Sequence, residues 1–340
     1  MKIVTFGEIM LRLQPYGYKR IMQAEAFEAV FGGGEANVSV SLAQMGADTA
    51  FITRLPENVI ADKCLKELRG WGVDTSRILR GGSRMGIYFC EKGEGVRASN
   101  VIYDRAHSAI SEITPDMLDV DKALEGAGWL HFTGITPALS ESAALTTLKL
   151  VSAAKEKGMR VSCDLNYRAK LWSRERAREV MSELLRYVDV LISNEEDCKD
   201  VLGLSAEGSD ITGGHLSAQA YADLGAKVRK MFPSIEYVAF TLRESLSASV
   251  NNWSALLCGD NVTAVSKKYR LEIVDRVGGG DSFGAGLIFA LSSGKRGEEA
   301  INFAVAASAL KHTVEGDFNV ASLKEIEKLM GGDASGRVQR

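Results

Sequence analysis

Short apolar runs alternate with longer amphipathic segments along most of the 340-residue sequence. The runs have the length of buried strands and lie at 3–6, 51–53, 129–133, 160–163, 188–192 and 237–240. The segments between them carry apolar residues at helical spacing, which predicts helices over 36–45, 58–69, 141–157, 174–187, 194–202 and 217–231. Strands joined by helices form parallel sheets that are covered on both faces. The sequence therefore predicts an α/β fold with a mostly parallel central sheet.

Two stretches, 12–35 and 84–107, break this rhythm. Both contain alternating apolar residues, aromatics and glycines without a helical pattern, so we expect short strands that together form a small lid outside the main sheet. The core would then comprise 1–11, 36–83 and 108–330. A hairpin turn is expected at Asn251 and Asn252, because asparagine tolerates the positive φ of a tight turn. Residues 331–340 are expected to form a flexible tail.

Charge and cysteine content exclude several classes of protein. With 41 Lys and Arg against 44 Asp and Glu, the chain has no positive excess with which to bind nucleic acid. The five cysteines are dispersed and include no C-x-x-C pair, which argues against disulfides and zinc sites. The amino-terminal apolar run is interrupted by Glu8 and Arg12, and no window reaches the roughly 20 apolar residues of a membrane span. We expect a soluble, cytoplasmic protein with no membrane partner.

The string "VDRVGGGDSFGAG" contains the strongest chemical signal. Gly278, Gly279 and Gly280 lead to Asp281 and into a predicted helix, so their N–H groups can surround an anion at a helix amino terminus. The string lacks the G-K-[ST] of a Walker A loop. Asp281 has two interpretations: an N-cap of the helix, or a base that takes a hydroxyl proton during phosphoryl transfer. Phosphoryl transfer to a hydroxyl would use both the glycine amides and the carboxylate.

The sequence resembles the ribokinase-like (PfkB) carbohydrate kinases, in this string and over nearly its whole length. Their signature D-T-x-G-A-G-D-x-F-x-x-G is matched in register by Asp275, Gly278, Gly280, Asp281, Phe283 and Gly286, whereas Arg276 and Gly279 replace the usual threonine and alanine. Gly33, Gly34 and Asn37 correspond to the amino-terminal signature G-G-x-x-x-N, with a glycine-to-asparagine gap one residue shorter. Within the family, the sequence is similar to 2-keto-3-deoxygluconate kinases in the strings "GEIMLRL", "FGGGEANVSVSLAQMG", "YDRAHSA", "FTGITPALS", "DLNYRAKLW", "SNEED" and "EGDFN".

The resemblance implies a ribokinase-like three-layer α/β/α sandwich with a small β lid over the sugar site. It also implies ATP-dependent phosphorylation of the terminal (6-) hydroxyl of 2-keto-3-deoxygluconate, with Asp281 as base and the amides of Gly278, Gly279 and Gly280 as anion hole. The residues facing the sugar acid would be Gly34, Asn37, Tyr88, Tyr103, Arg105, Arg168 and Asp317. A guanidinium suits this substrate because its planar fork binds a carboxylate bidentately.

The resemblance further implies a nucleotide site built by Asn166, Asn194, Thr241 and Arg243. Asp197, where the family has a glutamate, would organise Mg²⁺ through water, and Asp275 would lie beside a monovalent cation such as K⁺. Asn194 and the acids after it also fit the start of a helix. Family members associate, and exposed lid edges favour a partner, so a homodimer or larger homo-oligomer is expected. The four histidines show no metal-ligand spacing and are interpreted as structural.

Three alternatives stay open from the sequence. The chain could be another PfkB sugar kinase of the fructokinase or ribokinase type. It could be a sugar-binding protein without turnover, because Asp197 and the 241–245 segment depart from the family pattern. A nicotinamide-dependent oxidoreductase that uses the glycines at 32–34 is disfavoured, because these glycines lack the fingerprint that follows a first strand.

Overall fold

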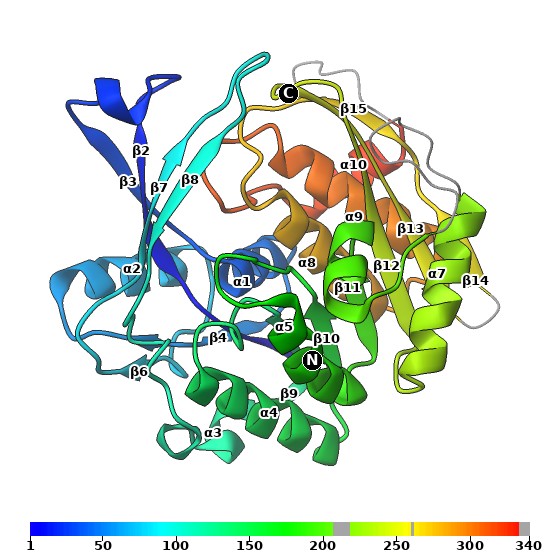
Figure 1. Cartoon of the computed structure of the whole chain (residues 1–340), viewed down its shortest axis with the longest axis horizontal. Coiled ribbons are helices and arrows are strands. Elements are labelled where there is room, and N and C mark those ends of the chain that lie inside the picture. The colour runs from blue at the N-terminus through cyan, green and yellow to red at the C-terminus, as the bar shows by residue number, and fades with distance from the viewer. Residues whose placement is uncertain (207–217, 260–261, 333–340) are drawn as a thin grey trace.

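The computed structural model describes residues 1–206, 218–259 and 262–332. Its main sheet has the order β14-β13-β12-β11-β10-β9-β1-β4, and β15 also pairs with β13 (Figure 1). Neighbours from β4 to β12 are parallel, whereas the pairings of β13 are antiparallel. The strands are β1 (Lys2–Phe6), β4 (Thr49–Ile52), β9 (Ala127–Thr133), β10 (Arg160–Asp164), β11 (Val190–Ser193), β12 (Tyr237–Ser245), β13 (Val250–Gly259), β14 (Val262–Val265) and β15 (Tyr269–Glu272). The predicted, mostly parallel sheet is confirmed.

Helices lie between these strands as the periodicity predicts and, within the described residues, three more follow β15. They are α1 (Gly34–Gln44), α2 (Val59–Gly70), α3 (Val120–Leu124), α4 (Glu141–Glu156), α5 (Arg174–Leu184), α6 (Glu195–Asp197), α7 (Ala218–Met231), α8 (Gly279–Ser292), α9 (Gly297–Lys311) and α10 (Leu323–Met330). Short 3₁₀ segments occupy Ile21–Gln23, Pro115–Met117 and Leu185–Tyr187, and a π-helical turn, Cys198–Leu202, extends α6. Most of the expected tail, 333–340, and His215 lie outside the described residues.

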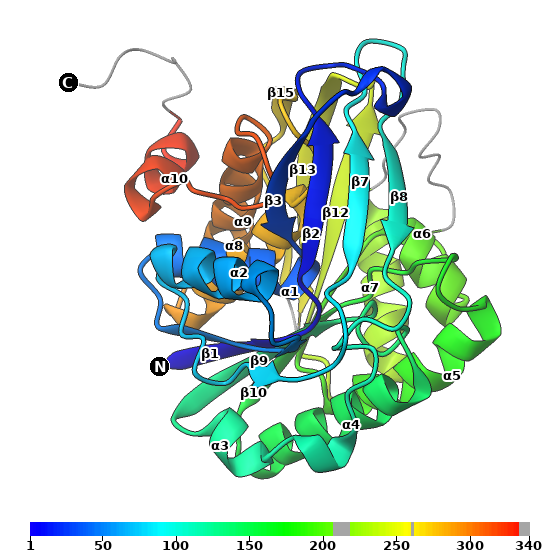
Figure 2. The ribbon, with the colours of Figure 1, turned by 90° about the vertical axis from the view of Figure 1, so that its left-hand side faces the viewer.

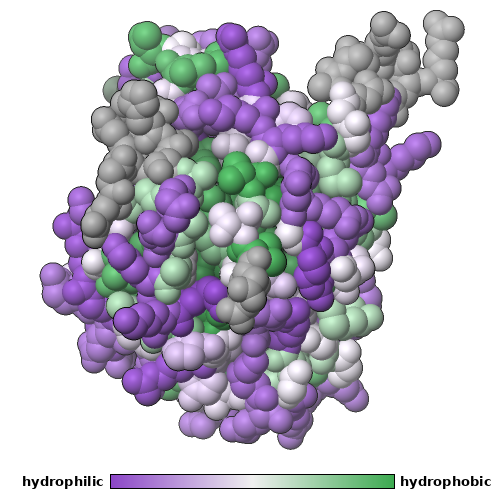
Figure 3. Space-filling model, turned by 90° about the vertical axis from the view of Figure 1, so that its right-hand side faces the viewer, coloured by the Kyte–Doolittle hydropathy of each residue, from purple (hydrophilic) through white to green (hydrophobic). Residues whose placement is uncertain are grey.

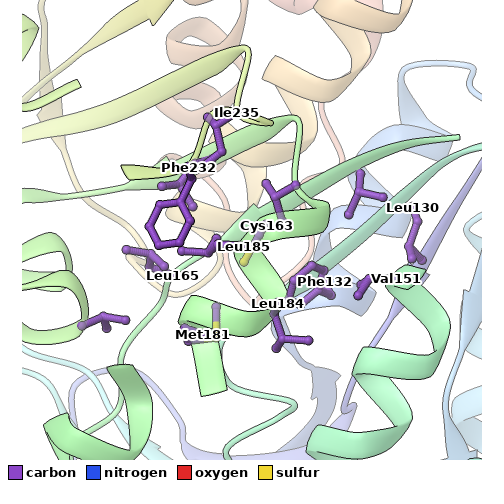
Figure 4. Close-up of a cluster of buried hydrophobic side chains, with 14 of the residues drawn as sticks. Leu130, Phe132, Val151, Cys163, Leu165, Met181, Leu184, Leu185, Phe232 and Ile235 are labelled. Atoms are coloured by element: carbon purple, nitrogen blue, oxygen red, sulfur yellow. The ribbon is translucent and has the colours of Figure 1, made fainter. Parts of the chain in front are cut away.

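Two apolar clusters hold the helices on opposite faces of the main sheet. One cluster lies beneath α4, α5 and α7 and includes Leu130, Phe132, Cys163, Met181 and Phe232 (Figure 4). The other joins the opposite face of the sheet to α1, α8 and α9. The fold is therefore a three-layer α/β/α sandwich, and burial of these apolar side chains provides its main stabilisation.

A second, four-stranded sheet stands apart from the helical layers (Figure 2). It has the order β3-β2-β7-β8 and is formed by β2 (Met10–Pro15), β3 (Phe27–Gly32), β7 (Ile87–Glu91) and β8 (Asn100–Asp104). A separate two-stranded sheet is formed by β5 (Arg54–Leu55) and β6 (Leu79–Arg80). In sequence, these strands fall between β3 and β7 of the four-stranded sheet. We call the four-stranded sheet the lid sheet.

The hairpin prediction was wrong in the position of its turn. The hairpin joins β12 to β13 through residues 246–249, and Asn251 and Asn252 lie inside β13 opposite Ser245 and Glu244. The turn is stabilised by the hydroxyl of Ser247, which accepts hydrogen bonds from the N–H groups of residues 249 and 250. Asn252 instead donates a cross-strand hydrogen bond of 2.9 Å to the Glu244 carboxylate. A serine turn and a cross-strand pair thus outweigh the turn preference of asparagine.

Figure 3 views the face that carries α7 and β14, where a group of apolar side chains lies among hydrophilic ones. Among the described residues, no helix combines the length and the apolar composition that crossing a bilayer requires.

Candidate active site

A cavity of about 550 Å³ lies between the lid sheet and the carboxyl-terminal ends of β10 and β11. Ligands of open α/β sheets bind at this end of the strands. Every site residue predicted from the sequence lines the cavity except Gly279 and Asp275; those that do are Gly34, Asn37, Tyr88, Tyr103, Arg105, Asn166, Arg168, Asn194, Asp197, Thr241, Arg243, Gly278, Gly280, Asp281 and Asp317. Residues far apart in sequence are thus brought to one site.

Two of the three glycines at the start of α8 are required, for different reasons. Gly278, the N-cap, has a φ of 82°, and a Cβ there would lie 2.0 Å from the Asp317 carbonyl oxygen. A Cβ on Gly279 would lie 2.4 Å from the His312 ring. Gly280 has no such neighbour within 4 Å and faces the cavity. The N–H of Gly279 donates to the Arg276 carbonyl, 3.3 Å away. The backbone can therefore lie close to a ligand at the amino terminus of α8.

Asp281 lies in the first turn of α8 and is not its N-cap. Its carboxylate accepts a hydrogen bond of 2.7 Å from the Asn37 amide, and the Asn37 carbonyl oxygen accepts one from the Gly33 N–H. The side chain of Asp281 is therefore held in position by α1. Burial raises the pKa of Asp281 to about 6, although the Asn37 hydrogen bond opposes the shift. A partly buried carboxylate that lines a cavity suits a general base.

Loss of activity in mild acid should follow from the raised pKa of Asp281. A base must be ionised to accept a proton, so kcat/KM should be constant near pH 8 and fall about tenfold per unit below about pH 6. The pH profile of the purified protein, measured with saturating ATP and Mg²⁺, tests this expectation. A profile that stays flat to about pH 5 would contradict the expected role of Asp281 as the base, provided that unfolding is excluded by circular dichroism at each pH.

Two further carboxylates lie near Asp281. Burial, with the nearby charges of Asp197 and Asp281, raises the pKa of Asp164 well above its usual range. Burial also raises the pKa of Asp197 to about 6, and the positive charge of Arg168 opposes this shift. Asn194 caps α6 by accepting the Asp197 N–H at 2.8 Å, and its amide donates to the Asp197 carboxylate at 3.0 Å. The predicted cap is confirmed, and the carboxylates gather at one end of the cavity beside Arg168.

The lid sheet contributes aromatic rings and a paired arginine. The Arg105 guanidinium donates to the buried Glu8 carboxylate through Nε, at 2.8 Å, and through Nη2, and Ser108 donates to the other Glu8 oxygen. It also lies 5.1 Å from the centre of the Tyr103 ring. The planar fork of Arg105 is therefore occupied by a carboxylate of the protein itself. Arg168, in contrast, donates one hydrogen bond, to the Tyr167 carbonyl, and has no ion pair within the described part of the chain.

A buried cluster of charges joins the lid sheet to the core. Arg12, on β2, is completely buried and forms ion pairs of 2.6 Å with both Asp275 and Asp317. The Tyr88 hydroxyl, on β7, donates to the second oxygen of Asp317 at 2.6 Å. Asp317 thus borders the cavity, but its carboxylate binds two lid side chains. We call Arg12, Lys311, Asp275 and Asp317 the buried charge cluster.

The side of the cavity that is lined by Arg243, Trp253, Arg276 and His312 is positive and aromatic. Burial and the neighbouring charge of Arg243 lower the pKa of Arg276, so two guanidinium groups lie close together there. The Trp253 ring lies 5.2 Å from the His312 ring, and both line the cavity. Burial lowers the pKa of His312 to about 4, which leaves the ring neutral near pH 7. Two adjacent positive charges favour an anionic ligand.

The residues present fit Mg²⁺ but not an added monovalent cation. Mg²⁺ binds one or two carboxylates together with waters and substrate phosphates, and Asp164 and Asp197 supply carboxylates whose repulsion a divalent cation would relieve. No group of three or more His, Cys, Asp or Glu in the described residues forms a complete metal cage. At Asp275, both carboxylate oxygens already accept hydrogen bonds, from Arg12 and from the N–H groups of residues 277 and 316.

Sequence reasoning missed several residues of the cavity. They include Glu8, Asp164, Tyr221, Asn251, Trp253 and Arg276. Asp164 could have been found, because it ends a predicted parallel strand at the edge where sites form. Glu8 could not, because its partner Arg105 is 97 residues away in sequence.

Comparisons with known proteins agree with this geometry. The family model described as pfkB family carbohydrate kinase matches residues 1–322. A 2-dehydro-3-deoxygalactonokinase of Haloferax volcanii is 35% identical over 98% of both chains. A 2-dehydro-3-deoxygluconokinase of Thermoproteus tenax is 30% identical over 97% of this chain and 94% of its own length. The crystal structure of 2-dehydro-3-deoxygluconokinase from Thermotoga maritima is 50% identical, with a TM-score of 0.94 over 98% of this chain and 100% of that chain.

The family match covers both the glycine segment before α8 and the strands of the lid sheet. The fold shared with the Thermotoga maritima structure is ribokinase-like, as the sequence predicted. The chain therefore belongs to the pfkB family of carbohydrate kinases and is a sugar kinase, a phosphotransferase with an alcohol group as acceptor.

Proposed function

We propose that this sugar kinase transfers the terminal phosphoryl group of ATP to the 6-hydroxyl of 2-keto-3-deoxygluconate. The observation that carries the proposal is the position of Asp281, which lies at the amino terminus of α8 between the lid side and the positive side of one cavity. The names of the relatives from Thermoproteus tenax and Thermotoga maritima support the same substrate class.

In the proposed reaction, the Asp281 carboxylate takes the proton of the sugar hydroxyl while the hydroxyl oxygen attacks the terminal phosphorus. The bond between that phosphorus and the bridging oxygen breaks, and ADP leaves with the electron pair. Amides of Gly278 and Gly280 would stabilise charge on the transferred group, whereas Gly279, whose N–H donates to the Arg276 carbonyl, would hold the turn. Asp197 and Asp164 would hold Mg²⁺ through water, and the ion would neutralise phosphate charge when bound. Thr241, Arg243, Asn166 and Asn194 would contact ATP.

The sugar acid would lie on the lid side of the cavity. Arg168 is our candidate for binding the carboxylate of the sugar acid. Its guanidinium donates one hydrogen bond, to the Tyr167 carbonyl, whereas the Arg105 guanidinium already binds the Glu8 carboxylate. Gly34, Asn37, Tyr88 and Tyr103 would contact the hydroxyl groups, and Arg105 and Asp317 would orient them. The lid segments 12–35 and 84–107 would exclude water, which otherwise competes for the phosphoryl group.

The setting of the enzyme is also part of the proposal. All five cysteines are buried and unpaired, which supports a reducing compartment such as the cytoplasm. The outer side of the lid sheet leaves Ile102 about half exposed, and β3 and β8 are its edge strands. Exposed strand edges and apolar surface support a homodimer or larger homo-oligomer.

A substrate panel tests the proposed function. We expect kcat/KM for 2-keto-3-deoxygluconate to exceed the values for fructose and ribose by at least about a hundredfold, because a site that binds a carboxylate leaves its partner unpaired with a neutral sugar. ADP release measures turnover, and ³¹P NMR of the product identifies the phosphorylated hydroxyl. Higher kcat/KM with fructose or ribose would assign another sugar kinase, and no turnover with any sugar would favour a sugar-binding protein.

The panel should include the galactonate epimer of the substrate. The Haloferax volcanii relative is named for that epimer, and it is 35% identical to this chain. The two sugar acids differ in the orientation of one hydroxyl, so their kcat/KM ratio measures how tightly the lid side of the cavity reads that group.

A further inference from the structure

Lys311 is a buried lysine whose side chain lies beside the Asp275–Gly278 segment. It is the last residue of α9, and its side chain is 0% exposed. Its Nζ lies 3.4 Å from the backbone carbonyl oxygens of both Asp275 and Val314. A Cβ on Gly278 would lie only 3.2 Å from the Lys311 Cε, so the lysine lies directly behind the N-cap of α8.

Two carbonyl oxygens around a buried ammonium resemble the coordination of a monovalent cation. Proteins hold K⁺ with backbone carbonyl oxygens that replace its hydration shell. An ammonium group has the same charge and a comparable radius, and it can bind the same carbonyls as a donor. Here the carbonyls come from the segment before α8 and the segment after α9, so one positive charge holds the two segments together.

Burial lowers the pKa of Lys311, and the negative charges of Asp275, Asp317 and Asp281 oppose this shift. Within the buried charge cluster itself, the charges balance without an added ion. Arg12 and Lys311 supply two positive charges, and Asp275 and Asp317 supply two negative ones. Each of these side chains is less than 5% exposed. A further cation would bring a third positive charge into this buried cluster, where an uncompensated charge is costly. The arrangement therefore disfavours K⁺ beside Asp275.

We propose that the Lys311 ammonium is a tethered monovalent cation, which positions the Gly278 turn and makes the enzyme independent of K⁺. Lys311 is a positioning residue, because it acts on the anion-binding segment through the carbonyl of Asp275. The part of the proposal that concerns catalysis rests on the proposed kinase reaction, whereas the part that concerns cation binding is independent of substrate.

The test compares potassium chloride with tetramethylammonium chloride at equal ionic strength, since the latter cation is too large for the site. For the wild type, we expect the same melting temperature and the same kinase rate in both salts. Lys311→Ala removes the charge and opens space between the two carbonyls. In tetramethylammonium it should lower the melting temperature and reduce the rate at least about tenfold, and potassium or ammonium chloride should restore part of both.

Two control variants separate this role from simple packing. Lys311→Met fills the space without a charge, so its losses should not respond to potassium. Lys295→Ala removes a partly exposed lysine that pairs with Glu299 at the start of the same helix, and it should behave like the wild type in both salts.

Three results would overturn the proposal. The first is a wild-type protein whose melting temperature is several degrees higher, or whose rate is severalfold higher, in potassium chloride than in tetramethylammonium chloride. The second is a Lys311→Ala protein as stable and active as the wild type without potassium. The third is a loss in Lys311→Ala that potassium and ammonium leave unchanged. If Lys311→Ala does not fold, the wild-type comparison still decides, and the melting temperatures decide even if the sugar substrate is another one.

Discussion

Replacing Asp281 with asparagine should lower kcat by about 10²- to 10⁴-fold, the usual loss when a general base is removed. The amide cannot accept the hydroxyl proton, although its oxygen can still accept the hydrogen bond from Asn37. Substrate binding should therefore change much less than kcat. Steady-state kinetics with the sugar acid and ATP, combined with calorimetric binding of the sugar acid, would separate the two effects.

Asp62→Asn is the matched control for this experiment. Asp62 lies in the first turn of α2, its side chain is 61% exposed, and it pairs with Arg80 at the surface. This variant should keep the wild-type kcat. An Asp281→Asn protein that retains more than about a tenth of the wild-type kcat, with an unchanged melting temperature, would exclude Asp281 as the base.

Replacing Arg12 with methionine should lower the free energy of unfolding by about 3–5 kcal/mol, the usual effect of breaking a buried ion pair. Methionine keeps much of the side-chain volume but leaves Asp275 and Asp317 buried without their common partner. The loss should also loosen the lid sheet, because Arg12 lies on β2. Urea unfolding at pH 7 measures the change, with the slope of the transition checked against the wild type.

A surface arginine provides the comparison. Arg176 pairs with Glu141 and Glu179, each at 2.7 Å, close to the 2.6 Å of the Arg12 pairs, but its side chain is 38% exposed. Arg176→Met should cost at most about 1 kcal/mol because solvent screens both pairs. Adding Asp275→Asn and Asp317→Asn to Arg12→Met should recover part of the lost stability. Equal losses for the two arginine variants would show that the buried pairs contribute no more than surface pairs.

The sheet could be predicted from the sequence because its strands are short apolar runs between helical segments. Glycine directly after a helix favours a left-handed cap, and Gly46, Gly72 and Gly158, which follow helices, have φ values of 90°, 87° and 71°. The turn between β12 and β13 could not be placed in this way. There a serine side chain bonds the backbone, and two asparagines with a strong turn preference pack inside a strand.

The site could be predicted only where a residue's role is local or belongs to a motif. The glycines and Asp281 are adjacent in sequence, so their meeting at one helix terminus needs no long-range information. Arg12 and Arg105 show the limit, because each is paired with an acid more than 90 residues away. From the sequence, Arg12 only interrupts an apolar run, and Arg105 is an available guanidinium.

The ion pairs of Arg12 also determine when the molecule can be completed during its synthesis. The guanidinium belongs to β2, whereas Asp275 and Asp317 are translated 263 and 305 residues later. Because a chain is made from the amino terminus onward, β2 emerges with a positive charge whose two acidic partners do not yet exist. The ion pairs that join the lid sheet to Asp275 and Asp317 can therefore form only after these 305 residues have been synthesised.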